Sequence, residues 1–77
     1  MIMETLDARN MLCPMPVIRT QDKVNGMASG EMLEVVCTDH GALNDIPTWC
    51  RINGHTVVET VDNDHEVIIR LEVHHGA

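Results

Sequence analysis

The last strand-like segment of the chain, residues 65–73, alternates apolar and polar side chains. The apolar positions are Val67, Ile69, Leu71 and Val73, and the polar positions include Glu66, Arg70 and Glu72. Successive side chains of a strand point to opposite faces of a sheet, so one face of this strand packs and the other meets water. A sheet that is covered on one face only belongs to a two-layer domain with helices on its apolar side.

The rest of the chain supplies the helices and strands for such a domain. Two segments have the apolar spacing of amphipathic helices, residues 14–28 and 39–53. Strand-like segments are residues 2–8, 31–37, 55–61 and 65–73. We therefore predict an α+β fold, a two-layer βαβαββ sandwich with two helices packed on one face of a four-stranded mixed sheet.

Local signals predict where these segments begin and end. Ser29-Gly30 is expected to end the first helix, and Asp39 is a suitable N-cap for the second. Pro47 is expected to distort or delay the first turn of that helix, and Gly54 suits the left-handed position after it. Asp62-Asn63-Asp64 provides turn residues for a hairpin between the last two strands. The inward helix positions are predicted to be Val17, Val24, Met27, Ala42, Ile46, Trp49 and Cys50, with Ile18 at the margin.

Length and charge limit the function. Residues 1–77 are expected to form a single domain, with residues 74–77 as a disordered tail. Five basic and twelve acidic side chains give a net charge of −7 without a basic stripe, which disfavours direct binding of nucleic acid. No segment has the length of a membrane span, and the start of the chain lacks the pattern of a signal peptide. We expect a cytoplasmic protein that works with protein partners.

The segment Leu12-Cys13-Pro14-Met15-Pro16 joins the first strand to the first helix and conflicts with simple helix rules. Pro14 suits a first helical position, but Pro16 disfavours helical geometry at Met15. Local conflicts of this kind are typical of functional sites. With Cys13 as the N-cap, the Met15 amide is the first-turn donor that can face the sulfur, and the helix dipole favours a thiolate. We expect a reactive Cys13 with a pKa below its ordinary value, beside an exposed Met15.

Each of the three cysteines also has a structural interpretation. Cys13 alternatively fills the corner between strand and helix as a small apolar residue. Cys37 lies on the apolar face of a strand and Cys50 on the apolar face of a helix, so both are expected in the core, with a second thiol near Cys13 as the alternative for Cys50. Because cysteines and histidines do not occur in close ligand pairs, we expect no metal site.

The segment from Leu6-Asp7 to Cys13-Pro14-Met15-Pro16-Val17 resembles the TusA/SirA-like sulfur-carrier family, whose signature is L-D-x-x-x-x-x-C-P-x-P followed by a helix. The resemblance covers about residues 5–73 and continues in Ser29-Gly30-Glu31-Met32-Leu33-Glu34-Val35, Asp45-Ile46-Pro47-Thr48-Trp49-Cys50 and Gly54-His55. The family fold is a two-layer βαβαββ sandwich, which agrees with the order predicted from periodicity.

The resemblance implies a sulfurtransferase of the persulfide-carrier type without a cofactor. Cys13 would accept sulfane sulfur from a donor protein of the cysteine desulfurase or rhodanese type and pass it to an acceptor protein. The pathways served by such carriers are tRNA thiolation, molybdenum-cofactor assembly and sulfur oxidation. Pro14 and Pro16 would hold the turn, while Arg9 and Arg19 would supply positive charge near the sulfur.

A different class of function is a regulatory or adaptor module, in which a helix surface binds a partner and Cys13 only packs. Two positions also depart from the family pattern. Asp39-His40-Gly41 stands where many relatives have Asp-Pro, and Asn44 stands where some have a basic residue. Sulfane-sulfur loading of the purified protein distinguishes a carrier from an adaptor.

Overall fold

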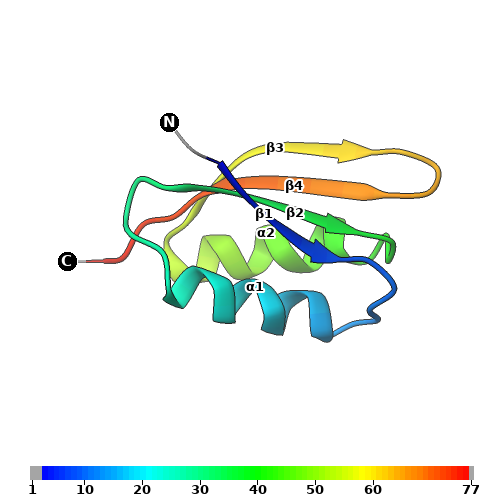
Figure 1. Cartoon of the computed structure of the whole chain (residues 1–77), viewed down its shortest axis with the longest axis horizontal. Helices are drawn as coiled ribbons and strands as arrows, with labels where there is room; N and C mark the ends of the chain where they lie inside the picture. Colours follow the sequence, from blue (N-terminus) through cyan, green and yellow to red (C-terminus); the bar gives the residue numbers. More distant parts are fainter. Residues whose placement is uncertain (1–2, 77) are drawn as a thin grey trace.

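The computed structural model describes residues 3–76, so Ile2 of the first predicted strand and Ala77 of the predicted tail lie outside the described residues. The elements follow the predicted order (Figure 1). They are β1 (Met3–Ala8), α1 (Met15–Asn25), β2 (Met32–Cys37), α2 (Ala42–Asn53), β3 (Thr56–Asp62) and β4 (Val67–Glu72). Neither helix in the described part of the chain is long and apolar enough to cross a membrane.

The strands form one mixed sheet in the order β1-β2-β4-β3. β1 and β2 are parallel, with Leu6 opposite Val35, and β2 and β4 are antiparallel, with Val35 opposite Ile69. β3 pairs with β4 in an antiparallel hairpin at the other edge. Both helices cover the same face of this sheet (Figure 1). The predicted two-layer α+β fold is confirmed.

The core lies between the sheet and the helices, and it is almost entirely aliphatic. The alternation predicted for the central strands is confirmed, because every second side chain of β2 and β4 is fully buried. These residues are Leu33, Val35, Cys37, Val67, Ile69 and Leu71, followed by Val73 just beyond β4. The helices contribute Val24, Ala42, Ile46 and Cys50, while Val17 and Trp49 are only partly buried against this core.

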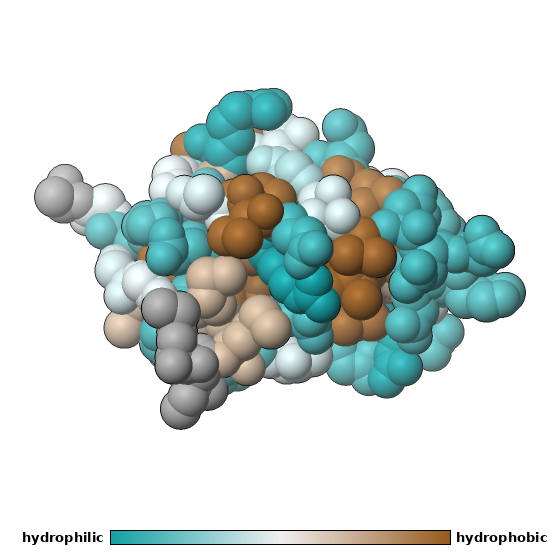
Figure 2. Space-filling model, turned by 90° about the horizontal axis from the view of Figure 1, so that it is seen from above, coloured by the Kyte–Doolittle hydropathy of each residue, from teal (hydrophilic) through white to brown (hydrophobic). Residues whose placement is uncertain are grey.

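The opposite face of the sheet is open, and Figure 2 shows it from above with hydrophilic side chains between hydrophobic patches. Arg70 of β4 links its two neighbouring strands on this face. Its guanidinium donates from Nε to Glu34 of β2 at 2.8 Å and from a terminal nitrogen to Glu59 of β3. The polar half of the predicted alternation thus forms cross-strand ion pairs.

Helix α1 is shorter than predicted. It ends at Asn25, because the backbone amides of Gly26 and Met27 turn back to the carbonyls of Lys23 and Val24. Ser29-Gly30 therefore lies in the following turn, and the prediction that it ends the helix is wrong. A further difference is Thr20, which is fully buried and donates its hydroxyl to the Pro16 carbonyl at 2.8 Å.

Helix α2 begins later than predicted and runs through Pro47 without a break. Asp39 is not its N-cap, because the cap position is Gly41 and the Asp39 carboxylate accepts the Gly41 amide at 2.9 Å. Pro47 lies beyond the first turn and does not distort it. The prediction for Gly54 is confirmed, since this residue closes the helix with φ of 84° and donates its amide to the Cys50 carbonyl.

His74 and His75, which belong to the predicted tail at residues 74–77, form hydrogen bonds with other parts of the fold. The His74 amide donates to Nδ1 of His55 at 3.0 Å, and the His75 amide donates to Oγ of Ser29 at 2.8 Å. The His75 ring also hydrogen-bonds the carbonyl of Met27 at 2.6 Å. Residues 74 and 75 therefore pack across the ends of other elements. The polarity of the segment alone does not reveal these distant hydrogen-bond partners.

Candidate functional site

The loop between β1 and α1 lies beside the loop between β2 and α2. This follows from topology, because β1 and β2 are parallel neighbours and their carboxyl ends share one edge of the sheet. Two hydrogen bonds join the loops: the Asn10 amide donates to Oγ1 of Thr38 at 2.9 Å, and the Cys13 amide donates to Oδ2 of Asp39 at 3.1 Å. The second loop thus supports the backbone of Cys13.

Cys13 is exposed at the start of α1. The N-cap position belongs to Pro14 and not to Cys13, and the peptide bond between these two residues is cis. The Met15 amide donates to the carbonyl of Leu12 at 2.9 Å. The expectation that this amide faces the sulfur is therefore wrong, since a turn of the backbone already takes the donor.

The polar partner of the Cys13 thiol is a carboxylate from α2. The sulfur donates to Oδ2 of Asp45 at 3.2 Å. This hydrogen bond is the main reason that the pKa of Cys13 is raised above its ordinary value, and desolvation and the negative charges of Asp45 and Asp39 act in the same direction. The predicted lowering of the Cys13 pKa is wrong, because the carboxylate disfavours the thiolate that the helix dipole favours.

Neither arginine expected to assist Cys13 forms a hydrogen bond to it within residues 3–76. Arg9 is engaged elsewhere: its guanidinium pairs with Asp7 at 3.0 Å and with Glu66 at 3.2 Å. Arg19 lies on the exposed side of α1. Arg9 and Arg19 are close to Cys13 in the sequence, but the ion-pair partners of Arg9 are Asp7 of β1 and Glu66 at the end of the distant hairpin.

Three large apolar side chains close to Cys13 in the sequence are exposed. Leu12 is 76% exposed, Met15 is 39% exposed and Ile18 is 43% exposed. The predicted exposure of Met15 is confirmed. We call Leu12, Met15 and Ile18 the apolar rim of Cys13. Exposed apolar groups next to a reactive side chain are typical of a surface that another protein covers.

The other two cysteines are in a different environment. Cys37 at the end of β2 and Cys50 in α2 are fully buried, as predicted, and both are free thiols. Burial raises the pKa of each to about 11. Apolar packing explains both positions, and reagents or partners reach only Cys13 at the surface.

Asp39 and Asp45 are the residues that sequence reasoning missed as neighbours of Cys13. The sequence predicts a helix cap at Asp39 and no role for Asp45. A signal was present, because a parallel pairing of the first two strands brings both strand-to-helix loops to one edge of the sheet. The predicted topology could thus have placed the start of α2 beside Cys13.

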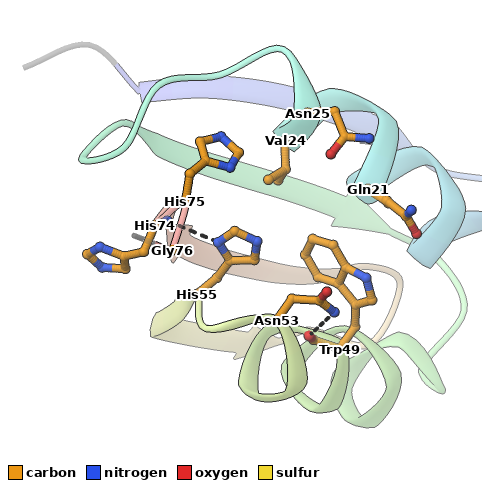
Figure 3. A pocket seen from close by; sticks show the side chains of 9 residues that line it. All are labelled: Gln21, Val24, Asn25, Trp49, Asn53, His55, His74, His75 and Gly76. Atoms are coloured by element: carbon orange, nitrogen blue, oxygen red, sulfur yellow. Dashed lines mark hydrogen bonds between the residues drawn. The ribbon is translucent and has the colours of Figure 1, made fainter.

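A separate hollow of about 330 Å³ lies between the C-terminal ends of the helices. These helix ends lie at the opposite end of the molecule from the loop that carries Cys13 (Figure 1). Its walls include Trp49, His55 and His75 (Figure 3). The rings of Trp49 and His55 stack at 5.0 Å, and the His75 ring meets His55 edge-on at 6.2 Å. The hollow contains no cysteine.

The fold and the site together define a class of protein: a small two-layer βαβαββ domain with one exposed cysteine at the first strand-to-helix corner. The family model described as "Sulfurtransferase TusA" matches residues 4–73. The chain therefore belongs to the TusA family.

Individual relatives agree with this assignment. The chain is 43% identical over 54 residues to the sulfur carrier protein TusA of Pseudomonas paraeruginosa, covering 70% of this chain and 68% of that protein. It is 33% identical over 57 residues to the sulfur carrier protein TusA of Allochromatium vinosum, covering 74% and 75%. Among solved structures, the SirA-like protein of Desulfitobacterium hafniense superposes with a TM-score of 0.80 at 19% identity, covering 92% of this chain and 96% of that one. This last similarity shows the fold.

Proposed function

We propose that the protein is a sulfur carrier of the sulfurtransferase type, in which Cys13 accepts sulfane sulfur as a persulfide and passes it to a partner protein. Membership of the TusA family supports the general role. The observation that carries the assignment to one residue is exposure: Cys13 is at the surface, whereas Cys37 and Cys50 are fully buried.

The proposed reaction is a thiol exchange that needs no cofactor. The Cys13 sulfur attacks the outer sulfur of a donor persulfide, so a new S–S bond forms on Cys13 while the S–S bond of the donor breaks. The donor leaves as a thiol and takes up the proton that Cys13 loses, so atoms and electrons balance. In the second half-reaction, a thiolate of the acceptor attacks the outer sulfur and restores the Cys13 thiol.

The partners that this chemistry requires are a donor and an acceptor protein. A cysteine desulfurase or a rhodanese-type protein fits the donor role, and the acceptor belongs to tRNA thiolation, molybdenum-cofactor assembly or sulfur oxidation in the cytoplasm. The apolar rim of Cys13 supports docking, since Leu12, Met15 and Ile18 leave apolar area uncovered at the start of α1 and in the loop before it. The hollow lies at the other end of the molecule and does not include Cys13. We therefore propose that a docked partner protein, and not a pocket of this chain, encloses the reacting sulfur.

The test is sulfur loading of the purified chain with polysulfide or with a persulfidated donor. Mass spectrometry should find an added sulfur on Cys13 that dithiothreitol removes. The variant Cys13→Ser should lose this adduct, while the matched variant Cys50→Ser should keep it. An adduct that persists on another residue of Cys13→Ser would contradict the assignment.

An adaptor role is the second candidate, and the same apolar rim favours it. In that case the rim would bind a partner and Cys13 would take no part in the chemistry. Such a protein would stay unmodified under the loading conditions above, and Cys13→Ser would bind its partner as well as the wild type does.

A further inference from the structure

Asp45 contacts the reacting sulfur of the proposed carrier directly. It lies in the first turn of α2, and its Oδ2 accepts the Cys13 thiol at 3.2 Å. Asp39 contacts the backbone of the same loop. Its Oδ2 accepts the Cys13 amide at 3.1 Å, and its Oδ1 accepts the Gly41 amide at 2.9 Å. One carboxylate from α2 and one from the loop before it therefore contact Cys13 of the first loop.

Neither carboxylate takes part in a salt bridge within residues 3–76. Arg9 pairs with Asp7 and Glu66 instead, and the His40 ring contacts Asp62 at 3.2 Å. Asp39 accepts two backbone amides, and Asp45 accepts the Cys13 thiol. The site thus presents two carboxylates without a salt-bridge partner among residues 3–76.

This arrangement acts against the reactive form of the cysteine. The thiolate is the nucleophile in sulfur exchange, whereas a carboxylate acceptor binds the neutral thiol and repels the thiolate. A positive side chain brought against Asp45 and Asp39 would offset that repulsion and favour loss of the thiol proton. The site is open to such an approach, because Cys13 and its apolar rim are exposed.

We propose that Asp45 is a positioning residue that keeps Cys13 as a thiol in the free protein, and that the sulfur donor activates Cys13 by placing a lysine or arginine against the carboxylates of Asp45 and Asp39. This inference rests on the proposed carrier function and specifies the chemistry of the donor surface. The cation enters beside the apolar rim, the thiol proton leaves with the departing donor sulfur, and the persulfide bond forms on Cys13 as the donor S–S bond breaks.

Small disulfides that differ only in charge test the proposal on the intact chain. Cystamine carries two ammonium groups, dithiodipropionate carries two carboxylates, and hydroxyethyl disulfide is neutral. Each forms a mixed disulfide with Cys13 and releases one thiolate, so mass spectrometry measures the initial rates at neutral pH and low salt. We expect Cys13 to react faster with cystamine than with dithiodipropionate.

The decisive comparison is Asp45→Asn with Asp22→Asn. Both variants change the net charge equally, but Asp22 is an exposed residue of α1 without a recorded contact to Cys13. We expect Asp45→Asn to reduce the preference for cystamine over dithiodipropionate about threefold, the size typical of one exposed charge contact, and to speed the reaction with the neutral disulfide. Asp22→Asn should behave like the wild type. Continued protection of Cys37 and Cys50 verifies that each variant is folded.

Two different results separate the failure of this proposal from the failure of the carrier function. If Cys13 accepts sulfane sulfur but Asp45→Asn and Asp22→Asn react alike with all three disulfides, the role of Asp45 is rejected and the carrier function stands. If folded wild-type protein does not accept sulfane sulfur on Cys13, the carrier function is rejected, and the proposed activation by the donor with it.

Discussion

At the scale of single residues, three cysteines with the same chemistry have different environments. Cys37 and Cys50 are held in an aliphatic core that raises the pKa of each to about 11. Cys13 is exposed, and its pKa is raised chiefly by the hydrogen bond to Asp45. Exposure and not acidity therefore distinguishes the candidate nucleophile in the free protein.

This environment predicts the pH dependence of alkylation. Because the folded-state pKa of Cys13 is raised, its thiolate appears at higher pH in the native protein than in the unfolded chain. The midpoint of iodoacetamide labelling at Cys13 should therefore lie above that of a denatured control, as measured by peptide mapping across pH. Cys37 and Cys50 should label more slowly than Cys13. A native midpoint at or below the denatured one would show that the Asp45 contact does not control this thiol.

At the scale of elements, the C-terminal segment after β4 connects the ends of several others. His74 donates its amide to the ring of His55, which precedes β3, and His75 contacts Ser29 and Met27 after α1. The His55 ring also stacks on Trp49 of α2. This segment joins the helix layer to the end of the sheet (Figure 3). The loop between β1 and α1, which carries Cys13, lies at the opposite end of the molecule (Figure 1).

The contact between His55 and His74 predicts that this segment is released in acid. Burial lowers the pKa of His55 below 6.5, and the charges of His75 and His74 act in the same direction. The stabilisation by neutral His55 is therefore complete above about pH 6.5 and is lost as the pH falls through the lower folded-state pKa. We expect the exchange protection of the His74 amide, measured by NMR, to decrease over that range.

Two variants isolate this effect. His55→Phe keeps an aromatic ring beside Trp49 but cannot accept the His74 amide, so the His74 amide should be poorly protected at every pH. His65→Ala removes an exposed histidine of the turn between β3 and β4 and should preserve the wild-type pH dependence. A pH-independent His74 amide in the wild type would contradict the prediction.

At the scale of the whole molecule, stability depends on the central strands. β2 lies between β1 and β4, and its Leu33 is fully buried in the core. A domain of 77 residues has a free energy of unfolding of roughly 4–12 kcal/mol at typical values per residue. The free energy lost with one large core side chain is therefore a substantial fraction of the free energy of unfolding.

Substitutions of two leucines, one buried and one exposed, test whether stability depends on the central strands. Leu33→Ala should lower the free energy of unfolding by about 2–5 kcal/mol, because it leaves a cavity in a close-packed core. Leu12→Ala removes the same atoms from a side chain that is 76% exposed, and it should change stability by less than about 0.5 kcal/mol. Urea titration followed by circular dichroism measures both. Equal losses in the two variants would show that Leu12 is packed in solution.

The periodicity of apolar side chains was sufficient to predict the strands and helices, because one face of this sheet is apolar and the other is polar. The alternation of β4 and the inward side of β2 were predicted correctly, since one face of each strand packs and the other carries Glu34 and Arg70. The predicted ends of the helices were less accurate. The end of α1 depends on backbone hydrogen bonds at Gly26, and the start of α2 depends on Asp39 turning toward Gly41 and Cys13.

The sequence by itself determined the fold class, the order of the elements, and the position of Cys13 at an exposed corner, because these follow from side-chain periodicity and from two local prolines. Only the tertiary structure decided the electrostatics of that cysteine. Asp45 is 32 positions away along the chain, and the parallel pairing of β1 and β2 brings it to the Cys13 sulfur. A hydrogen bond between distant residues depends on how two loops meet at one sheet edge, and the local pattern around Cys13 contains no record of its partner.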